Sequence, residues 1–287
     1  AVLAIKQTMY RTSPDSPVLE ALIEAAGRGK QVAVLVELTA RFDEANNIEW
    51  ARKLESAGVH VAYGLPEMKI HSKICLVVRE EVNGVTMYAH IGTGNYNSRT
   101  ARLYTDLGLF TADPRICADL LRIFNFLTGY SDIADTEEIL TAPANLRSGL
   151  AGRVEREIAH ALAGRPARIV FKMNALEDLE FTRLLYRASQ AGVKVDLIIR
   201  GICRLRPGIP GLSENVRVVS VIGRFLEHSR LYYFENGGDP EYFIGSADIM
   251  KRNLDERIEV LAPVRAPEHR RQLDDLVEGM LADQRQG

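Results

Sequence analysis

The segment that decides the fold is Met68-Lys69-Ile70-His71-Ser72-Lys73-Ile74-Cys75-Leu76-Val77-Val78, a His-x-Lys triplet inside a strand-like run. Apolar residues at Ile74, Leu76 and Val78 predict a strand with one buried face. Because alternate side chains of a strand share a face, His71 and Lys73 should point the same way. An imidazole beside a fixed ammonium is a nucleophile next to an anion ligand, which suits attack on phosphorus. Alone, however, a histidine in a strand is usually structural.

A second copy of the triplet favours a functional role for His71. Glu227-His228-Ser229-Arg230 again places His-Ser-basic before an apolar run. The two halves also repeat elsewhere, since Gly29 to Val36 matches Gly192 to Ile199 at an offset of 163 residues. The two histidines are 157 residues apart, so the second half has a shorter loop. A repeat this long predicts one domain per copy, residues 1–135 and residues 136–287.

Within each half, hydrophobic patterns alternate between strand and helix, which predicts an α/β fold with a mixed sheet flanked by helices. Asn83-Gly84 and Asn236-Gly237 predict hairpin turns, whereas residues 141–149 and 206–211 are typical of loops. Strands are expected at 2–10, 32–38, 59–63, 68–78, 86–91, 103–110, 167–173, 193–200, 216–222, 227–234 and 242–244. Helices are expected at 18–27, 43–57, 114–127, 152–163, 179–191 and from 267 onward.

Composition limits the classes of protein that remain. The 287 residues are 46% hydrophobic and 26% charged, as in a globular protein, and no run is long enough to span a membrane. The net charge of -2 means that a polyanion site must arise from local clustering of basic residues. Cys75, Cys117 and Cys203 are widely spaced and predict reduced, buried thiols. Ala1 runs directly into a strand-like segment, so we expect a piece of a longer protein.

Each half pairs its His-x-basic strand with a Gly-x-x-Asn/Asp loop, Gly92 to Asn95 and Gly245 to Asp248. This arrangement resembles the phospholipase D superfamily. The resemblance implies tandem domains related by a pseudo-twofold axis, with both histidines at one interface. The superfamily's Asp is replaced by Val78, and Arg230 stands in place of the second Lys. Both departures argue against cleavage of lipid or nucleic-acid phosphodiesters.

Longer segments resemble the two C-terminal catalytic domains of the first family of polyphosphate kinases. They are residues 6–17 (KQTMYRTSPDSP), 36–44 (VELTARFDE), 90–113 (HIGTGNYNSRTARLYTDLGLFTAD), 124–131 (FNFLTGYS), 204–214 (RLRPGIPGLSE) and 223–230 (GRFLEHSR). The resemblance implies transfer of the terminal phosphate of ATP to inorganic polyphosphate, reversibly, with Mg²⁺ as cofactor. It also implies N-terminal and head domains outside this chain, through which the full-length protein forms a homo-oligomer.

Carried over by position, the resemblance implies that His71 becomes phosphorylated. Arg11 and Arg41 would lie at the phosphate and Mg²⁺ site, and Tyr104, Arg200 and His228 would contact the phosphates of ATP. We add Lys73, Arg230 and Asn95 as site residues, because the two cations follow their histidines and the loop of Asn95 faces the site in the superfamily.

Simpler interpretations stay open for several of these residues. Arg11 and Arg41 could be solvated strand ends, although α/β sites gather at the carboxyl ends of strands. Tyr104 could be a packing residue, since Tyr is common in strands, and Asn95 could be only a turn residue. His60, His90, His160 and His269 have no counterpart in the other half, so we interpret them as structural or exposed.

Two rival functions remain from the sequence. One is a phosphodiesterase of the same fold, and the other is a non-catalytic module that binds polyanions. The two histidines should also differ: Asp248, if near His228, favours the imidazolium form of that ring, while His71 has only cations and amides nearby and stays neutral. We expect no nucleic-acid partner and a cytoplasmic location, with peripheral membrane association of the full-length protein left open.

Overall fold

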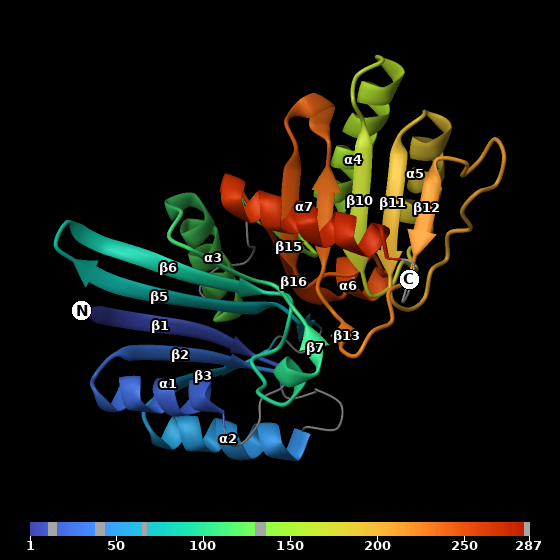
Figure 1. The fold of residues 1–287 in the computed structure, drawn as a ribbon. Coiled ribbons are helices and arrows are strands. Elements are labelled where there is room, and N and C mark those ends of the chain that lie inside the picture. Colours follow the sequence, from blue (N-terminus) through green and yellow to red (C-terminus); the bar gives the residue numbers. More distant parts are fainter. Residues whose placement is uncertain (11–15, 38–43, 65–67, 130–135, 284–287) are drawn as a thin grey trace.

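The computed structural model describes residues 1–10, 16–37, 44–64, 68–129 and 136–283. Two sheets form the frame of the molecule (Figure 1). The first has the order β3 (His60–Tyr63), β2 (Gln31–Val36), β1 (Val2–Met9), β5 (Lys73–Glu81), β6 (Gly84–Gly92), β8 (Gly108–Thr111). In it, β1, β2 and β3 are parallel, whereas β5, β6 and β8 are antiparallel to their neighbours.

The second sheet repeats this strand order and these directions. It runs β12 (Val216–Val219), β11 (Lys194–Ile199), β10 (Arg168–Met173), β14 (Leu231–Phe234), β15 (Glu241–Gly245), β16 (Arg257–Pro263), β4 (Lys69–Ile70), and β9 (Leu140–Ala142) also pairs with β16. The repeat predicted from the sequence is therefore present in the fold, as two tandem α/β units with the same strand order. A small parallel ribbon, β7 (Tyr104–Thr105) with β13 (Leu226–Glu227), joins the two halves.

The helices separate into an inner pair and two outer pairs. Outer helices α1 (Pro17–Gly27) and α2 (Glu44–Ser56) pack on the first sheet, and α4 (Leu146–Leu162) and α5 (Leu179–Gln190) pack on the second (Figure 1). Inner helices α3 (Pro114–Leu127) and α7 (Pro267–Leu281) share one buried cluster with residues from both sheets. Short helices complete the chain: η1 (Thr100–Arg102), η2 (Asn236–Gly238) and α6 (Lys251–Asp255).

Helix α3 illustrates how the sequence builds the inner layer. Asp113 caps its first turn by accepting hydrogen bonds from the backbone N–H groups of Arg115 and Ile116 at 2.9 and 3.4 Å. Pro114 occupies the first helical position, where no N–H is required. Its apolar residues recur at helical spacing and are buried between the sheets. The start and end of this helix were predicted correctly.

The strand expected at 68–78 is wrong in one respect, because it is broken at His71-Ser72. Strand β4 pairs with β16 of the second sheet, whereas β5 pairs with β1 of the first. The chain crosses between sheets at His71, and the N–H groups of His71 and Ser72 both donate to the carbonyl of Ile258 at 3.0 and 2.9 Å. The second copy is broken in the same way, between β13 and β14.

Other boundaries also differ from expectation. The strand expected at 103–110 is two strands, β7 and β8, because the first half of it pairs with β13 instead of the sheet. The loop expected at 141–149 contains most of β9 and the start of α4. Strand β16 was not anticipated. The three cysteines are free, as expected, but only Cys117 is fully buried.

Candidate active site

His71 lies at the break between β4 and β5, where it meets a carboxylate from the other half. Its Nδ1 atom is 2.9 Å from the carboxylate of Glu259 on β16. Glu259 has no exposed surface and also accepts hydrogen bonds from Ser246 Oγ and from Asn253 Nδ2, the latter at 2.6 Å. Because Nδ1 is bound to the carboxylate, Nε2 is the ring nitrogen left for substrate.

His228 has the mirrored arrangement. Its Nδ1 atom is 2.8 Å from Asp106, which follows β7 in the first half and also accepts a hydrogen bond from Thr93 Oγ1 at 2.6 Å. Arg230 Nη1 lies 3.1 Å from His228 Nε2 and donates to the His228 carbonyl at 2.9 Å. Each histidine is therefore held by a carboxylate from the opposite half of the chain.

These contacts correct the prediction of which carboxylates lie beside the two histidines. Asp248 does not bond to His228; it binds the Arg230 guanidinium at 3.2 Å and the backbone N–H of Asn174 at 2.8 Å. His71, expected to have only cations and amides nearby, contacts Glu259 instead. Burial, followed by the charge of Arg230, lowers the pKa of His228 although Asp106 raises it. The imidazolium form of His228 was expected only with Asp248 beside it, and that condition is not met.

Three cations act on His71, of which Lys73 and Arg230 are buried and Arg257 is half-buried. Burial lowers the pKa of His71 well below the ordinary value, and Lys73, Arg230 and Arg257 add to that shift, so the ring is neutral. Burial also lowers the pKa of Lys73 to about 7, with Glu259 opposing the shift. Burial raises the pKa of Glu259 to about 7. Lys73 Nζ donates to the His71 carbonyl, and Tyr10 packs edge-on against the imidazole at a ring separation of 5.3 Å.

The other expected residues are placed as follows. The Tyr104 ring lies 5.0 Å from the ring of His228. Asn95 lies in the loop after β6, and its buried Oδ1 has no hydrogen-bond partner among the described residues. Arg200 follows β11 at its carboxyl end, and within the described ranges its buried Nη1 likewise has no partner. Arg11 and Arg41 lie outside the residues that the structure describes.

The structure places the four histidines that were interpreted as structural or exposed as follows. His60 is exposed at the start of β3, and His269 is half-buried in α7. His90 Nδ1 lies 2.7 Å from the hydroxyl of Tyr96, and His160 lies 3.4 Å from Asn236 Oδ1.

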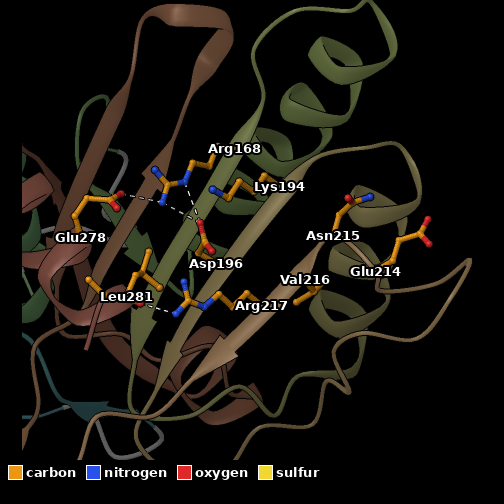
Figure 2. A pocket seen from close by; sticks show the side chains of 10 residues that line it. Arg168, Lys194, Asp196, Glu214, Asn215, Val216, Arg217, Glu278 and Leu281 are labelled. Atoms are coloured by element: carbon orange, nitrogen blue, oxygen red, sulfur yellow. Dashed lines mark hydrogen bonds and ion pairs between the residues drawn. The ribbon is translucent and has the colours of Figure 1, made fainter. Parts of the chain in front are cut away.

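A cavity of about 580 Å³ lies elsewhere on the second half (Figure 2). Arg168, Lys194 and Val216, the first residues of three parallel strands, line it together with the end of α7. It is thus at the amino ends of the strands, whereas Arg200 and the residues after β10 lie at their carboxyl ends. Arg168 there is paired with Asp196 at 2.9 Å and with Glu278 at 3.0 Å, which neutralises its charge. We therefore assign the chemistry to the histidine site and not to this cavity.

Sequence reasoning missed Glu259, Asp106 and Arg257. A signal for the two carboxylates was present: Asp106 follows Gly92 by 14 positions, and Glu259 follows Gly245 by 14. Their equivalence in the repeat would have marked them as a pair. Their cross-over to the opposite histidine, however, depends on how the halves pack.

The fold and the histidine contacts define a class before any family is considered: two tandem α/β units that each contribute a carboxylate to the histidine of the other. Solved structures agree with the fold. Phosphatidylserine synthase from Haemophilus influenzae covers 97% of this chain and 80% of its own, with a TM-score of 0.66 at 10% identity. Polyphosphate kinase from Porphyromonas gingivalis covers 98% of this chain and 46% of its own, with a TM-score of 0.89 at 40% identity.

The family follows from the sequence comparisons. The models for polyphosphate kinase C-terminal domains 1 and 2 match residues 1–133 and 139–287. The chain belongs to the polyphosphate kinase family. It is 59% identical over 285 residues to polyphosphate kinase of Thermosynechococcus vestitus and 58% identical over 282 residues to that of Streptomyces coelicolor. These alignments cover 99% and 98% of this chain but 39% and 38% of the relatives, so the chain spans about two fifths of their length.

Proposed function

We propose that this chain is the catalytic core of a polyphosphate kinase, which transfers the terminal phosphate of ATP to inorganic polyphosphate, and the reverse, through phospho-His71. The observation that supports this most is the buried 2.9 Å contact between His71 Nδ1 and Glu259, which leaves Nε2 free among cations. A neutral, oriented imidazole beside fixed positive charges is what attack on a phosphoryl group requires.

In the first step, the lone pair of His71 Nε2 forms a bond to the γ-phosphorus of ATP. The bond from that phosphorus to the bridging oxygen breaks, and its electron pair leaves with ADP. Glu259 accepts the hydrogen bond from Nδ1–H and stabilises the positive charge that develops on the ring. In the second step, a terminal oxygen of polyphosphate attacks the same phosphorus, and the P–N electron pair returns to Nε2.

In phosphoryl transfer, the protein must mainly stabilise the negative charge on the oxygens of the transferred group. Lys73 and Arg230 act on His71 from both halves, and Arg257 adds a third charge. The unpartnered Nη1 of Arg200 supports the assignment of that residue to ATP phosphates. We propose the same class of role for Arg11 and Arg41, and contacts to the nucleotide phosphates for Tyr104 and His228. Asn95 would donate to the same phosphates through its Nδ2 group, since its unpartnered Oδ1 is an acceptor like the phosphate oxygens.

We propose that Mg²⁺ arrives with ATP, bound to phosphate oxygens. In the described residues, no group of three or more His, Cys, Asp or Glu side chains is placed to hold a metal ion. Asp106, Asp248 and Glu259 are each already bound by a histidine or an arginine. Arginine itself is a phosphate ligand and not a metal ligand, so a role for Arg11 and Arg41 at a magnesium site would be through the phosphates.

His228 is proposed to act differently from His71, because Arg230 lies beside its Nε2. A neutral ring held by Asp106 keeps its one proton at Nδ1 and presents the Nε2 lone pair to Arg230, so it orients the guanidinium, which supplies the donors and the charge for the nucleotide phosphates. We also propose that the domains divide at residues 135 and 136, and that oligomer contacts and most binding of the base belong to parts of the full-length protein beyond this chain.

None of the described helices is both long enough and apolar enough to cross a membrane. We propose a cytoplasmic location, where ATP is available, and leave peripheral membrane association to experiment.

The test is labelling of the full-length protein with γ-³²P-ATP and Mg²⁺. We expect acid-labile, base-stable label on His71, as for a phosphoramidate, followed by labelled long polymer. His71→Ala should abolish the label, and His228→Ala should reduce overall transfer. Cleavage of a lipid or nucleic-acid diester without nucleotide would instead support the phosphodiesterase. Binding of polyphosphate with no label on protein would support the polyanion-binding module.

A further inference from the structure

Lys172 on β10 is a buried cation close to His228 that the mechanism above does not use. Its side chain is 3% exposed. Its Nζ atom donates to Ser229 Oγ at 2.7 Å and to the Ser229 carbonyl at 3.2 Å, and it lies 3.0 Å from the carboxylate of Glu227. Glu227 and Ser229 are the two neighbours of His228 in the chain. Lys172 therefore holds the segment between β13 and β14 through contacts on both sides of that histidine.

An ammonium group has three N–H donors and no acceptor. The two oxygens of Ser229 take two of these donors, and the carboxylate of Glu227 forms an ion pair with the ammonium at 3.0 Å that lacks the geometry of a hydrogen bond. The ammonium of Lys172 thus contacts the two chain neighbours of His228, which separates it from Arg230, whose Nη1 lies beside the imidazole itself. Its role must be exerted through the residues that it holds, as a positioning residue.

The segment that Lys172 holds also belongs to the ribbon between the halves. Leu226 pairs with Tyr104 and Glu227 pairs with Thr105, and the N–H of His228 donates to the Thr105 carbonyl at 3.2 Å. Asp106, the partner of His228, is the next residue. Tyr104, Asp106 and His228 therefore belong to one unit, and Lys172 links this unit to the second sheet.

In the first half, a neutral side chain takes the place of Lys172. Thr8 on β1 takes the corresponding place, donating from Oγ1 to the Ser72 carbonyl at 2.9 Å and accepting from the N–H of Ile74 at 3.0 Å. The hydroxyl of Ser72 is buried and has no hydrogen-bond partner among the described residues, unlike that of Ser229. At this position the two breaks thus differ by one ammonium–carboxylate pair.

We propose that Lys172 is the positioning residue of the nucleotide side of the site: it fixes Tyr104, Asp106 and His228 as one unit, independently of His71. The proposal rests on the proposed function, since it assigns that unit to the phosphates of ATP. His71 is held by other groups, Glu259 and the Ile258 carbonyl. Loss of Lys172 should therefore impair use of ATP more than use of polyphosphate.

The test uses the full-length enzyme with Lys172→Met, which keeps the length of the side chain and removes its charge. Misplacement of a catalytic group by about 1 Å can cost on the order of 10²-fold in rate, so we expect kcat/KM for ATP to fall about 10- to 100-fold. KM for polyphosphate in the reverse reaction should stay unchanged, and Lys172→Arg should recover part of the loss. Lys194→Met, the same change at the exposed first residue of β11, is the matched control and should behave as wild type.

A buried carboxylate left without its partner is costly, so Lys172→Met alone could fail to fold. The double variant Lys172→Met/Glu227→Gln removes both charges, and thermal unfolding is measured on each. The proposal is overturned if a folded variant keeps the wild-type KM and kcat for ATP, if both substrates are affected equally, or if neither variant folds. If wild type itself yields no phosphoenzyme and no polymer, the proposed function fails instead, and the two failures are distinguishable.

Discussion

The carboxylate of Glu259 lies 2.9 Å from Nδ1 of His71, although the two residues are 188 positions apart in the chain. Because Asp106 and His228 make the reciprocal contact over 122 positions, neither half contains a complete histidine–carboxylate pair. The site is therefore a property of the interface between the halves, and the groups that build it can be tested one at a time.

Glu259→Gln should slow phosphorylation of His71 severely. The amide is similar in size but carries no charge to hold Nδ1–H or to stabilise the phosphorylated ring. Replacing the orienting carboxylate of a catalytic histidine by an amide costs up to about 10⁴-fold in a well-studied hydrolase, and we expect about 10²- to 10⁴-fold here. Single-turnover labelling with γ-³²P-ATP measures it. Glu268→Gln, on the exposed first turn of α7, is the control. Wild-type labelling by Glu259→Gln would remove this carboxylate from the mechanism.

The charge of Lys73 should set an alkaline limit on activity. Its pKa is lowered to about 7, so the ammonium is present below that pH and is lost as the pH rises through it. We expect kcat/KM to fall on the alkaline side of about pH 7, and also on the acid side, where Glu259, whose pKa is raised to about 7, becomes protonated. Lys73→Arg, which copies the arginine found at position 230 in the second half, stays charged and should extend the plateau to higher pH even if its maximum is lower. Identical pH profiles for the two proteins would show that another group sets the limit.

Arg11→Ala and Arg41→Ala should each slow transfer by on the order of 10²–10³, the typical cost of removing one preorganised charge-stabilising donor. Lysine at either position should rescue only partly, because the bidentate guanidinium is lost. Steady-state rates of the full-length variants test this, with Arg28→Ala at the exposed end of α1 as the control. Rates near wild type in both alanine variants would make these arginines structural.

Asp119→Ala should destabilise the fold without touching the site. The buried carboxylate of Asp119 in α3 accepts the backbone N–H groups of Glu137, Glu138 and Ile139, the last two at 2.7 and 2.9 Å. Leaving buried donors unsatisfied costs about 1–3 kcal/mol. Urea unfolding should show a loss of that size, whereas Asp275→Ala on the exposed face of α7 should show none. An unchanged midpoint for Asp119→Ala would mean that water replaces the carboxylate.

The sequence predicted much of this fold because local patterns are consistent with it. The stripe of Ile116, Leu120 and Ile123 sets α3, and the apolar runs set β2 and β11. What could not be predicted depends on non-local pairing. Nothing within residues 68–78 shows that Lys69 and Ile70 pair with β16 while Lys73 onward pairs with β1.

The residues of the candidate site also separate into those that a local motif indicates and those that depend on non-local pairing. His71, Lys73, His228 and Arg230 were found because a motif is repeated, and the structure places them near one another. Glu259 and Asp106 were missed because each has its partner in the other half, and Lys172 because a lone lysine in a buried strand has no distinctive neighbours. The expected link between Asp248 and His228 failed because Arg230, with more donors, takes that carboxylate.

Strand β4 has a consequence for recombining this protein with its relatives. Its two residues, Lys69 and Ile70, belong by sequence to the first half but hydrogen-bond to Arg257 and Ile258 of the second. A chimera joined between α3 and β9 would thus inherit His71, the proposed nucleophile, from one parent and the strand that holds it, β16, from the other. Such hybrids should retain phosphorylation only where both parents supply matching backbone register at 257–258 and a carboxylate at 259, which makes this short pairing the compatibility test for any crossover.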